Sequence, residues 1–238
     1  MLEEILRTKG IQMGIVLDDQ KVTQFRKYYE LLIEWNQRMN LTAITDEEDA
    51  AYKHFLDSIS ILSFITMPLE ASIIDVGTGA GFPGIPLKIV RPDLHVVLLD
   101  SLHKRTLFLK ELANILSLRQ VRILHGRAED TSHQAEHREK YDVVFSRAVA
   151  EMNVLLELCL PFVKVGGTFI AYKGPGIFIE IENSGKALEL LGGKCEEIHP
   201  IEIPGRNYQH YVTIIRKVKH TPTAYSRKAG TPEKKPIL

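Results

Sequence analysis

The feature that most constrains the fold is a short apolar run that breaks into a glycine-rich loop, I-I-D-V-G-T-G-A-G-F-P-G-I-P at 73–86. Glycine lets the backbone approach a ligand where a Cβ would intrude, and such a loop directly after a buried strand is typical of nucleoside-cofactor sites. The next apolar run ends in Asp100, about 20 residues beyond the loop, which suits a carboxylate that binds ribose hydroxyls. The sequence therefore predicts a cofactor at the carboxyl ends of neighbouring strands.

Apolar strands alternate with helices after residue 71, and this pattern predicts a doubly wound α/β sheet. The turn residues 204–208 join the last two strands directly, so these strands should form an antiparallel hairpin. A seven-stranded sheet with such an end is the usual Rossmann-like architecture of class I S-adenosylmethionine-dependent methyltransferases. The strands are expected at 72–76, 95–100, 121–125, 142–146, 168–172, 195–203 and 211–217.

The first seventy residues read as helical and contain no strand. Apolar spacing predicts an amphipathic helix over 18–39, and Thr45 with Glu48 fits a capping box that begins a second helix. Later helices are expected over 102–116, with Leu102 on the buried stripe, and over 178–191. The predicted organisation is an N-terminal helical segment (1–70) packed on the core, a cofactor-binding domain (71–218) and a basic tail (219–238).

Composition narrows the class of protein. The chain has 238 residues and zero net charge, yet residues 216–238 contain seven basic side chains and one acidic one, a net charge of +6. This tail is either a polyanion contact or a solvated, irregular segment. No apolar run reaches the length of a bilayer span, and no leader pattern precedes the first helix, so we expect a cytoplasmic protein without membrane contact. Cys159 and Cys195 lack the spacing of a disulfide framework or a metal site.

The register of the glycine loop decides between two cofactors. The stretch from Gly79 to Gly84 formally matches the G-x-G-x-x-G pattern of dinucleotide-binding proteins. However, the first glycine after the strand is Gly77, and Pro83 and Pro86 remove backbone donors that a pyrophosphate would need. S-adenosylmethionine carries no phosphate. The loop therefore favours S-adenosylmethionine over NAD.

Several separated blocks resemble one family, the bacterial small-subunit (16S) ribosomal RNA guanine-N7 methyltransferases, also called glucose-inhibited division protein B. The resemblance extends from the first long helix to the last residue. F-P-G-I-P in the glycine loop, S-R-A-V-A at 146–150 and the tail are the blocks specific to this family. The remaining blocks are N-L-T-A-I at 40–44, K-H-F-L-D-S at 53–58, L-D-S-L-H-K-R at 99–105 and G-R-A-E at 126–129. The family tail usually has proline where Ser226 stands.

The resemblance implies which residues bind the cofactor. Gly77 and Phe82 correspond to loop contacts, Asp100 to the ribose acceptor, and Ala128 with Glu129 to the adenine side. Arg147 corresponds to a residue of the cofactor and substrate pocket. We also expect Gly79 to contact the cofactor, because it belongs to the glycine loop pattern. All of these residues follow predicted strands at their carboxyl ends, where open parallel sheets bind ligands.

The implied reaction is methyl transfer to N7 of a guanine in small-subunit ribosomal RNA. N7 has an in-plane lone pair and no hydrogen, so no general base, catalytic nucleophile or metal is expected. Candidate RNA contacts are Lys173, Arg206, Arg227 and Lys228, with Tyr208 as a stacking residue; each could equally be ordinary surface. His54 and Asp57 lie one helical turn apart, a spacing more often found in a surface hydrogen bond or a domain contact than in a catalytic pair. No stable protein partner is expected, and the substrate is either RNA or a ribonucleoprotein particle.

Three other functions are also compatible with the sequence. A methyltransferase of proteins or small molecules would keep the fold and change the substrate. An NAD-dependent oxidoreductase rests only on the formal glycine match, and a nucleic-acid-binding module without catalysis would lack cofactor affinity.

Overall fold

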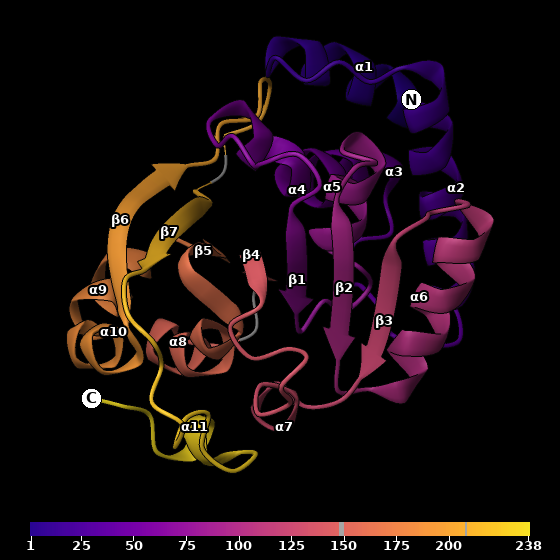
Figure 1. The fold of residues 1–238 in the computed structure, drawn as a ribbon. Coiled ribbons are helices and arrows are strands. Elements are labelled where there is room, and N and C mark those ends of the chain that lie inside the picture. Colours follow the sequence, from indigo (N-terminus) through magenta and orange to yellow (C-terminus); the bar gives the residue numbers. More distant parts are fainter. Residues whose placement is uncertain (148–149, 208) are drawn as a thin grey trace.

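The computed structural model describes residues 1–147, 150–207 and 209–238. Seven strands form one sheet in the order β3-β2-β1-β4-β5-β7-β6, in which β7 lies antiparallel between β5 and β6. This is the predicted doubly wound sheet with an antiparallel terminal hairpin (Figure 1). The strands are β1 (Ser72–Val76), β2 (His95–Asp100), β3 (Val121–His125), β4 (Tyr141–Arg147), β5 (Val163–Lys173), β6 (Gly193–Pro200) and β7 (Tyr211–Lys217).

Helices cover both faces because the central strands are apolar on both sides. In β1, Ile73 belongs to a core shared with the N-terminal helices, whereas its neighbour Ile74 belongs to the core on the opposite face. Figure 1 shows α8, α9 and α10 gathered beside the β5 to β6 end of the sheet. The helices of the sheet region are α5 (Gly84–Val90), α6 (His103–Ile115), α7 (Ala128–Thr131), α8 (Met152–Cys159), α9 (Ile177–Glu182) and α10 (Gly185–Leu191).

The N-terminal segment is helical, as predicted, and packs on the sheet. It contains α1 (Leu2–Gln12), α2 (Asp19–Asn36), α3 (Glu47–Ala50) and α4 (Asp57–Ile59), with a π-helical turn at Ala51–Leu56. The predicted capping box is wrong: the N-cap of α3 is Asp46, whose carboxylate accepts a hydrogen bond from the Asp49 amide at 2.9 Å. The Asp46 carboxylate thus accepts a backbone amide at the start of the helix, the role that was predicted for the Thr45 hydroxyl.

Two further predictions need correction. The helix expected over 178–191 is divided into α9 and α10, and at the break the Ser184 hydroxyl donates to the Glu180 carbonyl. Such back-bonding competes with the regular helix. Leu102 is 52% exposed instead of buried. It precedes α6 in an extended conformation, so the helical periodicity does not apply to its side chain.

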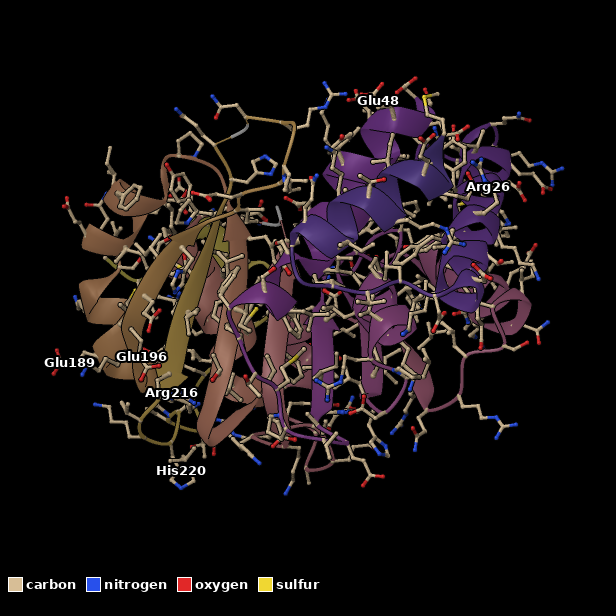
Figure 2. All side chains as sticks on the ribbon, turned by 90° about the horizontal axis from the view of Figure 1, so that it is seen from above. Arg26, Glu48, Glu189, Glu196, Arg216 and His220 are labelled. Carbon is tan, nitrogen blue, oxygen red and sulfur yellow. The ribbon has the colours of Figure 1, made fainter. Side chains whose placement is uncertain are left out.

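The exposed edge of the sheet carries paired charges. Glu196 of β6 faces Arg216 of β7 at 3.2 Å (Figure 2). Charged side chains on an edge strand discourage pairing with another chain. Arg216 is one of the basic residues of the tail region, and it is therefore engaged within the fold.

The C-terminal segment packs against the core on the Ile74 face of the sheet, and it contains one short helix, α11 (Thr231–Lys234). Arg138 donates to the backbone oxygens of Thr221 and Tyr225, and Arg227 forms an ion pair with the buried Glu157 at 2.6 Å. In Figure 1, α11 lies next to α7, in agreement with a hydrogen bond from the Gly230 amide to the Glu129 carboxylate at 2.8 Å. The tail cation Arg227, together with hydrogen bonds to the tail backbone, thus holds the tail on the protein.

We expect Arg227→Ala to lower the free energy of unfolding by about 3 kcal/mol, because it leaves the buried Glu157 carboxylate without its charged partner. Lys228→Ala is the matched control: this neighbour is exposed, and its removal should change stability by less than about 0.5 kcal/mol. Urea unfolding followed by circular dichroism measures both. Equal effects in the two variants would show that the ion pair does not anchor the tail.

Candidate active site

The glycine loop after β1 has a backbone conformation that glycine favours. Gly77, Gly79 and Gly81 all have positive φ angles, of 71°, 61° and 99°. The Gly77 amide donates to the Leu99 carbonyl of β2 at 2.9 Å, which ties the loop to the neighbouring strand. A Cβ at Gly79 would meet nothing within 4 Å, so this position faces open space.

Two buried carboxylates hold the loop. Asp75 is fully buried, and its Oδ2 accepts hydrogen bonds from the Thr78 hydroxyl at 2.7 Å and from the Gly84 amide at 2.9 Å. Its Oδ1 has no partner among the described residues. Burial raises the pKa of Asp75 to about 7, against the hydrogen bonds that favour the charged form. Asp75 therefore keeps its proton in part at neutral pH.

Asp100, the other carboxylate, joins two elements at the end of β2. It accepts the Gly79 amide at 2.9 Å and the Leu102 amide at 2.8 Å, and Arg105 approaches it at 3.4 Å. An aspartate between a strand and a helix can act either as a ribose acceptor or as a helix cap. The structure shows that Asp100 supports the start of the helix, and its contact with ribose stays a prediction. Its side chain is 2% exposed and lies in the walls of two cavities.

The inner cavity, of 180 Å³, lies over the ends of β1, β2 and β3. Gly77, Asp100, Ala128 and Glu129 line it, so four of the predicted cofactor residues meet here. The tail also contributes to the wall, with Pro232 and Glu233 of α11. Nothing in the sequence indicated this contribution, because it depends on how the tail folds back over α7.

The central cavity, of 390 Å³, shares Gly77 and Asp100 with the inner cavity. Gly79, Phe82 and Arg147 line it together with His54 from the N-terminal segment. All seven predicted cofactor residues therefore lie around two adjoining cavities. The N-terminal segment forms part of this site, which the sequence had presented only as a helical segment packed on the core.

An ionic cluster of Arg147, Asp57 and His210 borders the central cavity through Arg147. Arg147 donates to Asp57 Oδ2 at 3.1 Å, and Asp57 Oδ1 lies 3.0 Å from His210 Nδ1. The pair of His54 and Asp57 is thus buried and lies between the N-terminal segment and the sheet, so the alternative of a domain contact is correct. The Asp57 carboxylate raises the pKa of His210.

Phe82 lies against this cluster. Its ring stacks on the His54 ring with the centroids 4.5 Å apart, and the Arg147 guanidinium lies 4.8 Å from the Phe82 centroid. On its other side, Phe82 stacks on Tyr28, whose hydroxyl donates to the Ala80 carbonyl. Burial, assisted by the Arg147 charge, lowers the pKa of His54 to about 4. His54 is therefore neutral at pH 7.

A third cavity, of 490 Å³, shares His54 and Arg147 with the central cavity, and we call it the side cavity. Ile44, Tyr172 and Ile201 provide apolar walls, and Lys53 and Lys173 add cations. Its size is within the range of small-molecule pockets. His54 and Arg147 thus stand at the junction of two cavities.

Most of the predicted RNA contacts have partners within the protein. Lys173 pairs with Glu180 at 2.7 Å and donates to the Ala150 carbonyl at 2.8 Å. Arg206 pairs with Glu48 and lies over the Tyr52 ring, and Arg227 pairs with Glu157. Lys228 is exposed, and Tyr208 lies outside the described residues. Within the described part of the chain, no cluster of side chains could hold a metal ion.

Solved structures share the fold. A SAM dependent methyltransferase from Aquifex aeolicus matches with a TM-score of 0.52 and 20% identity, over 68% of this chain and 92% of that chain. The fibrillarin pre-rRNA processing protein of Methanococcus jannaschii matches with a TM-score of 0.50 and 18% identity, over 65% of this chain and 71% of that chain. The fold is therefore that of the class I methyltransferases.

Sequence comparison then identifies the family. The family model described as rRNA small subunit methyltransferase G matches residues 21–209. Proteins named ribosomal RNA small subunit methyltransferase G from Alkaliphilus metalliredigens and Acetivibrio thermocellus are 52% and 51% identical to the chain. They align over 98% and 99% of this chain and 98% and 97% of their own lengths. The chain belongs to the rRNA small subunit methyltransferase G family.

The raised pKa of Asp75 predicts how stability depends on pH. The folded protein holds this proton up to about pH 7, whereas the unfolded chain releases it near the ordinary value of 3.8. The contribution of Asp75 to stability is therefore complete below pH 4 and is lost as the pH rises to about 7. We expect the stability advantage of the wild type over Asp75→Asn to decrease between about pH 4 and about pH 7, the window set by these two pKa values, in urea unfolding. Parallel stability curves would contradict the assignment.

Proposed function

We propose that this protein transfers a methyl group from S-adenosylmethionine to N7 of a guanine in small-subunit (16S) ribosomal RNA. The observation that carries the proposal is the near-full-length identity of about half with proteins named ribosomal RNA small subunit methyltransferase G. The glycine loop and its adjoining cavities support it, because they provide a place for the donor beside a separate place for the acceptor. The oxidoreductase alternative has no support in the family or in the sheet order.

The inner and central cavities fit the donor. The open space at Gly79 allows close approach to the backbone, and Asp100 presents a carboxylate in the walls of both cavities. Ala128 and Glu129 lie on the adenine side in this arrangement, and Phe82 and Arg147 lie at the opposite end. When bound, S-adenosylmethionine supplies a methyl group on a positively charged sulfonium.

The side cavity is our candidate for the acceptor base. It meets the central cavity at His54 and Arg147, so a base held there faces the methyl-donor end of the site. Guanine N7 has no proton to remove, and the site accordingly needs alignment and exclusion of water more than a base. Asp57 is committed to Arg147 and His210, which makes it a structural group.

Positive charge moves onto the purine during the transfer, and the site has features that tolerate it. His54 is neutral, and the Arg147 charge is compensated by Asp57 at 3.1 Å. The wall between the cavities therefore adds little net positive charge. A preorganised environment of this kind lowers the cost of a developing cation.

Among the predicted RNA contacts, Lys173 and Arg206 remain candidates. To bind a phosphate, Lys173 would have to break or share its ion pair with Glu180, and Arg206 its ion pair with Glu48. Lys228 is exposed, whereas Arg227 is better explained as the tail anchor. No helix of the described residues is long and apolar enough to span a membrane. We infer that the protein acts as a monomer in the cytoplasm, on RNA or on the assembling particle.

The test is methyl transfer from labelled S-adenosylmethionine to protein-free 16S RNA and, separately, to small ribosomal subunits. We expect 7-methylguanosine in the digested RNA from one of the two substrates, as detected by mass spectrometry. If label appears only in protein or in small molecules and none appears in guanine, the proposed function is wrong. The protein would then be a methyltransferase of proteins or small molecules.

A pair of glycine variants tests the position of the donor. Gly79→Ala and Gly166→Ala both place an alanine at positive φ in open space, so each should cost about 1 kcal/mol of stability. Only Gly79 lines the central cavity, and we expect only Gly79→Ala to weaken binding of S-adenosylhomocysteine, by at least about tenfold, in calorimetric titration. Equal affinities in the two variants would exclude the loop as the binding site.

A further inference from the structure

A separate groove of 410 Å³ lies between the end of α2 and the start of α6. We call it the α2–α6 groove, and its principal lining residues are Arg38, Leu41, Leu102, His103, Lys104 and Arg105. Among the described residues no acidic side chain lines it. Among the described candidates for RNA contact, Lys173, Arg206, Arg227 and Lys228 do not line this groove.

The cations of the α2–α6 groove are largely uncommitted. Arg38 and Lys104 are exposed, and in the part of the chain that the structure describes their side chains form no hydrogen bond or ion pair. Among the described residues, the Arg105 guanidinium contacts one acid, Asp100, at 3.4 Å. By contrast, Lys173, Arg206 and Arg227 are each paired with an acid. An unpaired cation can neutralise an external anion without first giving up an internal partner.

The groove also has an apolar floor. Leu102 is 52% exposed, although the helical pattern predicted it to be buried, and Leu41 lies beside it in the lining. Exposed apolar surface bordered by cations is typical of a surface that binds another molecule. A polynucleotide fits both features, since its phosphates need cations and its sugars and bases offer apolar faces.

The groove is continuous with the active site. It shares Leu41 and Arg105 with the central cavity, and the central cavity shares His54 and Arg147 with the side cavity. A strand whose target base enters the side cavity can therefore pass over the central cavity and reach the groove. This continuity separates the α2–α6 groove from basic surface elsewhere on the protein.

The structure assigns to the α2–α6 groove the binding of the RNA strand that flanks the target guanine, with Arg38 and Lys104 contacting its phosphates. This inference rests on the proposed function for the identity of the RNA. It also explains how a protein of zero net charge can bind a polyanion, because recognition depends on a local group of unpaired cations.

The test compares two double variants with the same change in charge. Arg38→Gln/Lys104→Gln removes the two groove cations, and Lys27→Gln/Lys110→Gln removes exposed cations of α2 and α6 that do not line the groove. The probe is end-labelled, protein-free 16S ribosomal RNA in filter binding over a range of salt concentrations. We expect the groove variant to bind at least about tenfold more weakly and its log–log salt slope to fall by about 2. Equal losses in both double variants would overturn the assignment.

Two further readouts separate this inference from the proposed function. Affinity for S-adenosylhomocysteine should be unchanged in both double variants, and KM for RNA should rise in the groove variant with kcat retained. If the wild type methylates guanine and the groove variant binds RNA as the control does, only the groove assignment fails. If the groove variant loses RNA affinity but the wild type transfers no methyl group, only the proposed function fails. A loss confined to intact subunits, with protein-free RNA unaffected, would indicate a ribosomal protein as the partner and overturn the assignment.

Discussion

The structure of the site depends on one carboxylate at the end of β2. Asp100 accepts the amide of Gly79 in the glycine loop and the amide of Leu102 at the start of α6, at 2.9 and 2.8 Å. These bonds fix the loop relative to the helix while the carboxylate itself lies in the walls of two cavities. The same side chain that was expected to bind ribose therefore also builds the pocket. A carboxylate whose two oxygens accept backbone amides is held in one orientation, which suits both roles.

The rest of the site is assembled from segments that are distant in sequence. Phe82 of the glycine loop lies against Tyr28 on one side and against His54 and Arg147 on the other, so the N-terminal helices complete a wall that the sheet alone does not form. At the opposite end, the tail closes the inner cavity through Pro232 and Glu233. The two adjoining cavities proposed for the donor are thus built from the sheet together with both ends of the chain.

The sequence predicted the features that depend on neighbouring residues. Four strands have the predicted bounds, and the last two strands form the predicted antiparallel hairpin, because apolar runs and turn residues are local signals. The exposed Leu102 was missed because it precedes α6 in an extended conformation, and the Asp46 cap was missed because Thr45 and Asp46 are adjacent and both can cap a helix. The pairing of Arg227 with Glu157 could not be read from the sequence, since the two residues are 70 positions apart and the charge run gave no indication of its partner. For the same reason, the sequence did not indicate Arg38 and Lys104 as RNA contacts. We propose them because the other candidate cations, Lys173, Arg206 and Arg227, are paired with acids.

The central claim is that the loop held by Asp75 and Asp100 binds a phosphate-free nucleoside donor. Calorimetric titration of the wild-type protein with S-adenosylhomocysteine and, separately, with NADH tests this claim most directly. We expect saturable binding of S-adenosylhomocysteine at one site and no binding heat with NADH. Binding of NADH with no response to S-adenosylhomocysteine would contradict it.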